Sequence, residues 1–160
     1  METIMIKPIG VIHTPFKTIE GMPIQPAGAQ AVMGEVVVEP AYTGGLDDID
    51  GFSHLILIYA FHRSRGYELK VKPFLDDRER GLFATRAPRR PNPIGISVVS
   101  LKSREDNILH VAGIDVLDGT PLLDIKPYVP AFDAPEVTAV GWFSGKEDQS
   151  RDMRSDERFK

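Results

Sequence analysis

The sequence contains no cysteine among its 160 residues. This absence excludes disulfide bonds, thiolate metal sites and cysteine nucleophiles, and it fits a reducing compartment. No apolar run approaches the roughly 20 residues of a membrane span. The first residues, Met1 to Thr3, lack the basic region and long apolar stretch of a signal peptide. We therefore expect a cytoplasmic protein without a membrane segment.

The common signatures of nucleotide binding and hydrolysis are also missing. The sequence has neither G-x-G-x-x-G nor G-x-x-x-x-G-K-[ST], and no G-x-S-x-G nucleophile motif. The histidines His13, His54, His62 and His110 show neither H-x-H nor H-E-x-x-H spacing. We expect no metal site from them, because metal-binding histidines usually recur at such short intervals.

The overall charge is not that of a general nucleic-acid binder. The net charge is −4, whereas phosphate contacts require lysine and arginine. Five arginines nevertheless fall within residues 78–90, opposed only by Glu79. This cluster is either a solvated surface or a local face for phosphate, and the sequence leaves both interpretations open.

The residues that are present indicate a mainly β domain. Apolar residues make up 42% and charged residues 26%, and the 14 glycines and 13 prolines separate short β-rich runs. Many short strands with few helices are typical of a sandwich or a barrel. We predict one domain over residues 1–144 and a charged tail over 145–160. The predicted strands are residues 4–12, 33–39, 52–62, 69–74, 94–102, 107–117, 122–125 and 137–143, with a short helix or turn at 42–50.

The most unusual segment is residues 81–97. Pro88, Pro91 and Pro93 lie within six residues and fix the backbone angles of the segment. A stiff loop that presents Arg86 and its neighbours loses little entropy when a ligand binds. The alternative is a rigid connection between strands with arginines on the surface.

Two further segments carry polar groups at strand ends. Residues 115–128 contain Asp115, Asp118 and Asp124, whose carboxylates would accept ribose hydroxyls or lie near a sulfonium cation. Their more frequent role is to cap the backbone of a hairpin turn. His62 and Arg63 end the apolar run of residues 52–62, where a histidine is either a site residue or a hydrogen-bonded half-buried one.

Taken together, these segments resemble the TrmO (YaeB/TsaA-like) family. The matching blocks follow the family's order across roughly residues 5–130, and the long block from Phe83 to Ser97 is compositionally unusual. They are Ile9-Gly10-Val11-Ile12, Gln25-Pro26, Gly51-Phe52-Ser53-His54-Leu55, Phe83-Ala84-Thr85-Arg86, Arg90-Pro91-Asn92-Pro93-Ile94-Gly95-Ile96-Ser97, Asp118-Gly119-Thr120-Pro121 and Asp124-Ile125-Lys126-Pro127-Tyr128.

The resemblance implies a fold, a cofactor and a substrate. It implies a single-domain β-barrel that works as a homodimer, uses S-adenosylmethionine, and methylates N6 of threonylcarbamoyl-adenosine beside the anticodon of tRNA. By motif match, the cofactor contacts would be Gln25, Pro26, Ala27, His62, Arg63, Arg86, Ile96, Asp118, Gly119, Thr120 and Pro121.

The chemistry implied by the resemblance needs no metal but benefits from a base. An acylated N6 is a poor nucleophile because its lone pair is delocalised, so removal of its proton would help. Candidate bases are Asp118, Asp124, His62 and Tyr128, and spacing does not select among them. We expect Asp118, Tyr128 and Arg86 to act in catalysis, and Arg89, Arg90 and Asn92 to contact RNA.

Two other functions remain open at this stage. One is a β-barrel that binds tRNA or a nucleotide without turnover, since barrels with basic loops do bind RNA. The other is an S-adenosylmethionine-dependent enzyme with a different substrate, such as a small metabolite.

Overall fold

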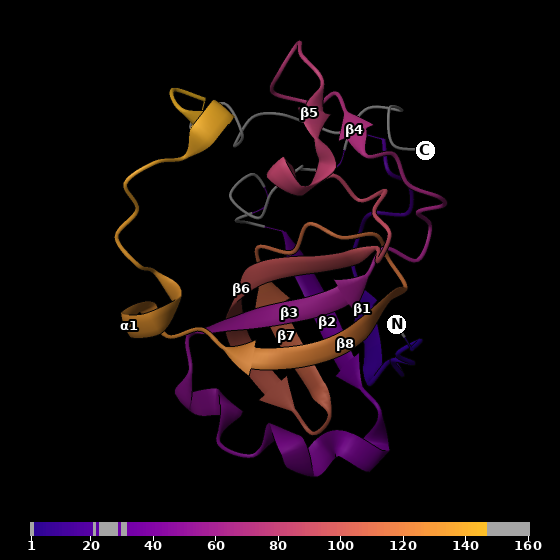
Figure 1. Cartoon of the computed structure of the whole chain (residues 1–160). Helices are drawn as coiled ribbons and strands as arrows, with labels where there is room; N and C mark the ends of the chain where they lie inside the picture. Colours follow the sequence, from indigo (N-terminus) through magenta and orange to yellow (C-terminus); the bar gives the residue numbers. More distant parts are fainter. Residues whose placement is uncertain (1, 21, 23–28, 30–31, 147–160) are drawn as a thin grey trace.

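A closed six-stranded β-barrel forms the body of the protein in the computed structural model, which describes residues 2–20, 22, 29 and 32–146 (Figure 1). The order around the barrel is β1-β2-β7-β6-β3-β8, and every neighbouring pair is antiparallel. The barrel strands are β1 (Gly10–His13), β2 (Met33–Val38), β3 (His54–Ala60), β6 (Ile94–Glu105), β7 (Ile108–Ala112) and β8 (Thr120–Pro127). The predicted single-domain, mainly β barrel is confirmed.

The barrel interior is filled by alternate side chains of each strand, as the two-residue period of a β-strand requires. On β3, for example, Leu55 and Leu57 are fully buried, whereas Ile56 and Ile58 on the other face are partly exposed. The buried cluster also contains Ile12, Val36, Val38, Val99, Leu109, Val111 and Leu122. Burial of these aliphatic side chains is the main stabilising contribution, about 1.5–3 kcal/mol for each.

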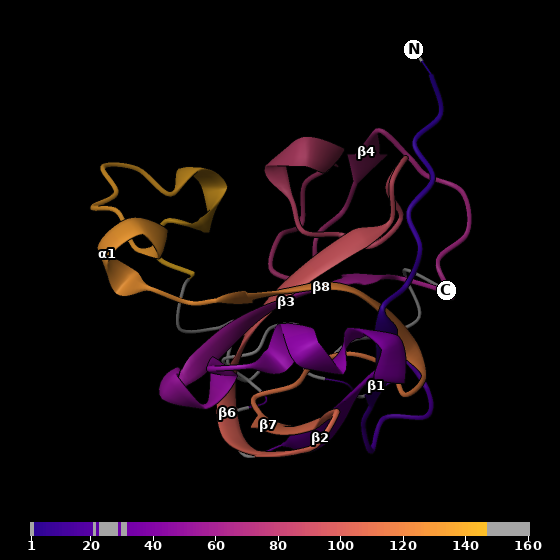
Figure 2. The ribbon, with the colours of Figure 1, turned by 90° about the horizontal axis from the view of Figure 1, so that it is seen from below.

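Short helices close one end of the barrel. The 3₁₀ helices η2 (Pro40–Leu46) and η3 (Ile49–Gly51) cross this end between β2 and β3, as the view from below shows (Figure 2). Leu46 of η2 is buried in the main core cluster. This end therefore offers no entrance to the interior.

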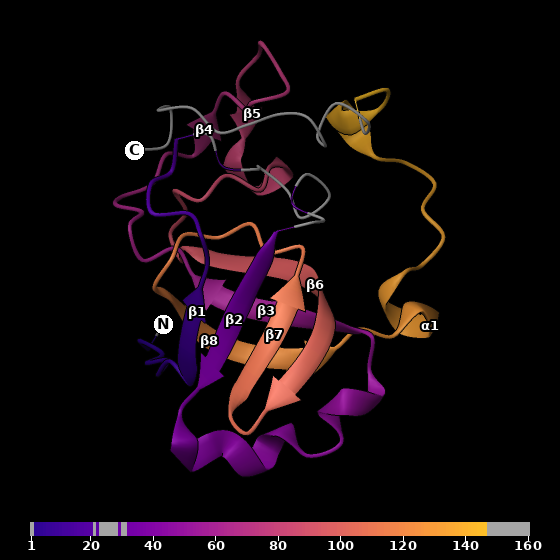
Figure 3. The ribbon, with the colours of Figure 1, turned by 180° about the vertical axis from the view of Figure 1, so that it is seen from behind.

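The opposite end is covered by a separate cap, seen above the barrel from both sides (Figures 1 and 3). The cap consists of the two-stranded sheet β4 (Lys70–Val71) and β5 (Arg80–Gly81), followed by η4 (Leu82–Ala84). Val71, Leu82 and Ala87, with Phe74 against them, form a second small apolar core. The proline-rich residues 85–93 then lead from the cap into β6.

The chain after β8 does not form the last strand that the sequence predicts at residues 137–143. It leaves the barrel through the short helix α1 (Pro130–Asp133), runs exposed over residues 134–140, and reaches the cap as η5 (Gly141–Phe143) (Figure 1). The Trp142 indole donates a hydrogen bond to the Ala84 carbonyl oxygen (2.7 Å). The prediction was wrong because β8 already closes the barrel by pairing with β1. Within the described residues, no helix is long and apolar enough to cross a membrane.

Candidate active site

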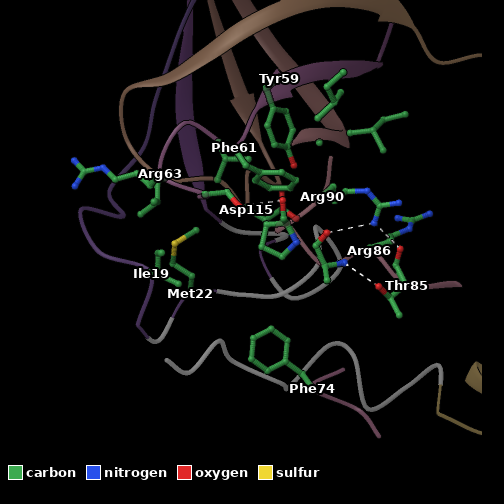
Figure 4. Close-up of a pocket in the computed structure, with 18 of the residues that line it drawn as sticks. Ile19, Met22, Tyr59, Phe61, Arg63, Phe74, Thr85, Arg86, Arg90 and Asp115 are labelled. Atoms are coloured by element: carbon green, nitrogen blue, oxygen red, sulfur yellow. Dashed lines mark hydrogen bonds between the residues drawn. The ribbon is translucent and has the colours of Figure 1, made fainter. Parts of the chain in front are cut away.

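A cavity of about 380 Å³ lies between the capped end of the barrel and the cap itself (Figure 4). Segments far apart in the sequence line it: the end of β3, the start of β6, the β7–β8 connection, the proline-rich loop and η5. Much of the wall is apolar, including Ile19, Met22, Phe61, Phe74, Trp142 and Phe143. Small-molecule sites have this size and this mainly apolar lining with a few polar groups.

A chain of polar side chains lies at the barrel side of this cavity. Tyr59 Oη and Ser97 Oγ are 2.9 Å apart, and Ser97 Oγ donates a hydrogen bond to Asp115 Oδ1 (2.6 Å). Since the serine hydroxyl has a single proton and gives it to the carboxylate, the Tyr59 hydroxyl must donate to Ser97. Tyr59 and Asp115 line the cavity.

Strand register explains how these groups meet. Tyr59 of β3 is paired with Gly95 of β6, two residues before Ser97. A Cβ on Gly95 would lie 2.6 Å from Cζ of Tyr59 and 2.8 Å from Cζ of Phe61. Glycine at this position therefore allows both rings to pack against the β6 backbone. The rings are in edge contact, with centroids 5.5 Å apart.

The local environment makes Asp115 an unusual carboxyl group. Burial raises its pKa to about 6, while the hydrogen bond from Ser97 and the positive charge of Arg86 act in the opposite direction. Burial, and then the nearby Asp115 charge, raise the pKa of Tyr59, so its hydroxyl stays protonated. Burial and the neighbouring Arg63 lower the pKa of His62, which keeps this imidazole neutral at neutral pH.

The arginines of the proline-rich loop have different surroundings. Arg86 lines the cavity near Asp115 and Tyr59. Arg90 also lines it, but its guanidinium donates to the carbonyl oxygens of Thr85 (3.0 Å) and Ala87 (3.3 Å) and lies 5.7 Å from the Phe83 ring centroid. Arg89 donates to the Arg65 carbonyl oxygen (3.3 Å) and faces Glu68 at 3.6 Å. The hydrogen bonds of Arg90 to Thr85 and Ala87 therefore hold the loop in shape, whereas Arg89 contacts residues outside the loop.

The structure brings together five of the expected cofactor contacts: His62, Arg63, Arg86, Ile96 and Thr120 all line the cavity. Gly119 and Pro121 flank Thr120 without lining it, and Gly119 has the positive φ of 75° that the predicted turn needs. Gln25, Pro26 and Ala27 lie outside the described residues. Asn92 is exposed within the proline-rich loop.

Asp118 and Tyr128 do not line the cavity. The Asp118 carboxylate accepts hydrogen bonds from Lys17 Nζ (2.6 Å) and the Thr14 amide (3.1 Å), and the His13 ring lies at 3.2 Å. The Lys17 hydrogen bond is the main reason that the pKa of Asp118 falls to about 2. Tyr128 follows β8, and its amide donates to the His54 carbonyl oxygen at the other end of β3 from Tyr59.

Sequence reasoning missed Tyr59 and Ser97, and it noted Asp115 without proposing it as a base. One signal was available, because Asp115 is the only charged residue between Ile114 and Leu117 in a run that is otherwise apolar. Ser97 and Tyr59 carry no such signal, because each is a single polar group within a strand pattern. Among the described residues, no cluster of three or more His, Cys, Asp or Glu side chains has a geometry that would hold a metal ion.

Comparison with known proteins identifies the family. The sequence model of the tRNA-methyltransferase O (TrmO) N-terminal domain matches residues 11–134. The chain belongs to the TrmO family. The family expected from the sequence motifs is therefore confirmed.

Individual relatives agree with this membership. A probable S-adenosyl-L-methionine-binding protein of Pyrococcus abyssi is 51% identical over 98% of this chain and 85% of its own length. The human tRNA (adenine(37)-N6)-methyltransferase is 31% identical over 83% of this chain, but over only 32% of its own length. The crystal structure of TrmO from Pseudomonas aeruginosa superposes with a TM-score of 0.74 at 38% identity, covering 88% of this chain and 63% of that one. The chain thus spans less than two thirds of the crystallised TrmO.

Proposed function

We propose that this protein is an S-adenosylmethionine-dependent methyltransferase that modifies N6 of adenosine 37 in tRNA, with threonylcarbamoyl-adenosine as the acceptor. The observation that carries this proposal is the cavity of about 380 Å³, lined mostly by residues within the range that the family model matches, with an apolar wall and the half-buried carboxylate of Asp115. Relatives named as S-adenosyl-L-methionine-binding proteins and as tRNA (adenine(37)-N6)-methyltransferases support it. We also propose that the protein acts on its tRNA substrate in the cytoplasm.

The residues around the cavity fit S-adenosylmethionine. The adenine of this cofactor has flat apolar faces that suit a wall of Ile19, Met22 and Phe74. Its amino-acid end carries a carboxylate, which an arginine such as Arg63 or Arg86 binds through paired N–H groups. When bound, the cofactor supplies the methyl group, so the protein has to orient the reactants and control a proton.

The contacts of Asp118 indicate that it has a structural role beside the site. Its carboxylate binds Thr14 and Lys17, and its amide donates to the Phe16 carbonyl oxygen (2.8 Å). These contacts fix the segment that leads to Ile19 and Met22 in the cavity wall. We therefore assign Asp118 to holding this wall in place.

Arg89 and Asn92 are the residues of the loop that we propose for tRNA contact. Asn92 is exposed and Arg89 is partly exposed, and the ion pair of Arg89 with the exposed Glu68 is long at 3.6 Å. An exposed pair of this kind contributes little and exchanges readily for a phosphate. Arg90 takes part indirectly, by fixing the loop that presents them.

We also propose that two copies associate through an apolar stripe on the outside of the barrel. Strands β3 and β6 lie on the side of the barrel toward the reader in Figure 1. Their outward side chains include the aliphatic residues Ile56, Ile58, Ile94, Ile96 and Val98. The outer face of an antiparallel sheet is normally polar where it meets water. Exposed aliphatic patches mark interaction sites, and the homodimer expected for this family fits the stripe.

The test is a calorimetric titration with S-adenosylmethionine and S-adenosylhomocysteine, followed by methylation of two tRNA substrates. One substrate carries threonylcarbamoyl-adenosine at position 37 and the other carries unmodified adenosine. We expect saturable binding of both ligands and one methyl group per modified tRNA. Absence of binding at millimolar ligand would favour an RNA-binding barrel. Binding without methylation of either tRNA would favour a different substrate.

A further inference from the structure

Asp115 differs from Asp118 and Asp124, the other two aspartates of residues 115–128, in how it is held. Asp118 is paired directly with Lys17 and Asp124 with Lys126, at 2.6 and 2.7 Å. Asp115 is instead held by the neutral hydroxyl of Ser97, which binds its Oδ1 atom. A directly paired cation makes a carboxylate a weaker base than a neutral donor does. The Ser97 hydroxyl orients Asp115, and it lowers the pKa of this carboxyl by less than burial raises it.

The arrangement behind Asp115 is rigid. Ser97 is fully buried on β6, and Tyr59, which donates to it, is buried on β3. The two strands are directly paired, and Gly95 allows the Tyr59 ring to lie against the β6 backbone. A proton acceptor works best when such neighbours fix its position before the substrate arrives.

The remaining charged groups that face Asp115 have defined positions. Arg86 in the proline-rich loop is the charged group that lowers the pKa of Asp115, and Asp115 in turn raises the pKa of the neutral Tyr59 hydroxyl on β3. His62, Arg63 and Arg90 line the same cavity. Trp142 and Phe143 of η5 cover it without a charge. Asp115 is therefore the carboxylate that lines the cavity among the described residues.

We propose that Asp115 is the general base of the methyl transfer, and that Ser97 and Tyr59 are the residues that position it. This inference rests on the proposed function. The methyl carbon forms its bond to N6 as the carbon–sulfur bond breaks, and that bonding pair stays on sulfur. The N6 proton moves to the Asp115 carboxylate, and the N–H bonding pair stays on nitrogen. The products are N6-methylated adenosine, the neutral thioether and a protonated Asp115, which returns its proton to water.

The first experiment compares the wild type with Asp115→Asn. This variant keeps the shape of the side chain and the oxygen that accepts a hydrogen bond from Ser97, but it is not basic. We expect kcat to fall by about 100-fold or more, the usual range for loss of a general base. Affinity for S-adenosylhomocysteine should stay within about threefold, which also shows that the variant is folded. Asp106→Asn is the matched control, because Asp106 is an exposed turn residue with a φ of 53° that asparagine also adopts. Asp115→Glu should recover part of the activity.

The second experiment tests the positioning residues through pH. Because the Ser97 hydrogen bond lowers the pKa of Asp115, Ser97→Ala should move the acidic limb of the kcat profile to higher pH. Tyr59→Phe should move it less, because its hydroxyl acts through Ser97. Carboxyl ¹³C NMR of the ligand-free protein should show one aspartate titrating near the same pH as that limb. This signal should be absent from Asp115→Asn and shifted upward in Ser97→Ala.

Three results would overturn the inference. Asp115→Asn with kcat within threefold of the wild type would show that no base is needed there. Loss of affinity for the cationic S-adenosylmethionine but not for S-adenosylhomocysteine, with an unchanged acidic limb, would make Asp115 a counter-ion. A wild-type chain that binds cofactor but methylates no tRNA would contradict the proposed function, and the inference with it. The first two results leave the proposed function standing.

Discussion

At the scale of single residues, Gly95 is a position where a small change should have a large structural effect. It lies opposite Tyr59 in the β3–β6 pair, and its missing side chain leaves room for two aromatic rings. Gly44 in η2 has no atom within 4 Å of the position that a Cβ would occupy. The two glycines therefore provide a matched pair in which only one substitution creates a clash.

We expect Gly95→Ala to lower the free energy of unfolding by about 1–3 kcal/mol, the usual cost of overpacking a well-packed site. The added methyl group would lie 2.6 Å from Tyr59 Cζ unless the ring moves. Gly44→Ala should change stability by well under 1 kcal/mol. Urea unfolding of both variants measures this difference. Equal stability of the two variants would show that Tyr59 moves without cost.

Asp118 gives a prediction about pH. Its folded-state pKa is lowered to about 2, first by the hydrogen bond from Lys17. A lowered carboxyl pKa stabilises the fold above the ordinary value of 3.8, and this contribution disappears as pH falls toward 2. We expect Asp118→Asn to cost about 1 kcal/mol or less at pH 7, because Lys17 is exposed. Most of this cost should be lost at pH 2, where about half of the Asp118 carboxyl groups are protonated.

Urea unfolding at pH 7, 4 and 2 tests this. Asp76 also has a pKa lowered to about 2, so the wild type will lose stability over the same interval for two reasons. The difference between wild type and Asp118→Asn isolates the Asp118 contribution. A difference that does not depend on pH would mean that the asparagine disturbs the Thr14–Lys17 segment by its shape.

At the scale of elements, most barrel strands could be predicted from the sequence and their partners could not. The predicted strands at 33–39, 52–62 and 94–102 correspond to β2, β3 and β6 with modest differences in their ends. The strand predicted at 107–117 corresponds to β7, which ends five residues earlier, at Ala112. Residues 4–9, predicted as part of the first strand, precede β1 and are largely exposed. An apolar pattern indicates which residues suit a strand. The bounds of β1 are set instead by the residues that can pair with β2 on one side and β8 on the other.

The candidate site was predictable by segment more than by residue. The proline-rich loop and the β7–β8 turn carry compositional signals, and both line the cavity. The Tyr59–Ser97–Asp115 chain depends on the register of two strands and on a connection far along the sequence. Sequence spacing contains no information about such a register. For the same reason it did not distinguish Asp115 from the other aspartates in residues 115–128.

The proline-rich loop supports a prediction that separates two neighbouring arginines. Arg90 donates to the carbonyl oxygens of Thr85 and Ala87, so Arg90→Ala should deform the loop and weaken S-adenosylmethionine binding at least tenfold. Arg89→Ala should leave cofactor binding within threefold. It should weaken tRNA binding and reduce the slope of log K against log salt by about 1, as loss of one phosphate contact does.

Calorimetry with cofactor and filter binding of tRNA at several salt concentrations measure both effects. Arg78→Ala is the control, because this exposed arginine lies in the cap and does not line the cavity. An unchanged salt slope for Arg89→Ala would return Arg89 to the solvated surface. Unchanged cofactor affinity for Arg90→Ala would show that the prolines alone hold the loop.

At the scale of the whole molecule, the two ends of the barrel differ in role, and so do its two sides. η2 and η3 seal one end, while the cap and η5 enclose the cavity at the other. The side formed by β3 and β6 carries the apolar stripe, and Ile96 belongs both to this stripe and to the cavity wall. A second copy seated on the stripe would therefore reach the edge of the site.

The stripe leads to a prediction that couples assembly to binding. Val98 is 36% exposed, pairs with Ile56 at the end of the stripe away from the cavity, and does not line the cavity. Val98→Asp would bury a charge in the proposed interface, and an unpaired buried charge is strongly unfavourable. We expect a wild-type dimer and a Val98→Asp monomer in light scattering after size exclusion, with dimer dissociation at least 100-fold easier. Met33→Asp is the matched control, since Met33 is 52% exposed on β2, on the far side of the barrel (Figure 3).

Cofactor affinity in the same variants then shows what the partner contributes. Because Ile96 links the stripe to the cavity, separation of the copies should expose this wall to water and weaken S-adenosylmethionine binding in Val98→Asp but not in Met33→Asp. A Val98→Asp monomer with wild-type affinity would mean that one chain contains the complete cofactor site. A wild-type monomer would contradict the proposed homodimer, and the apolar stripe would then have to meet another partner, of which tRNA is a poor candidate because the stripe has no cation to offer its phosphates.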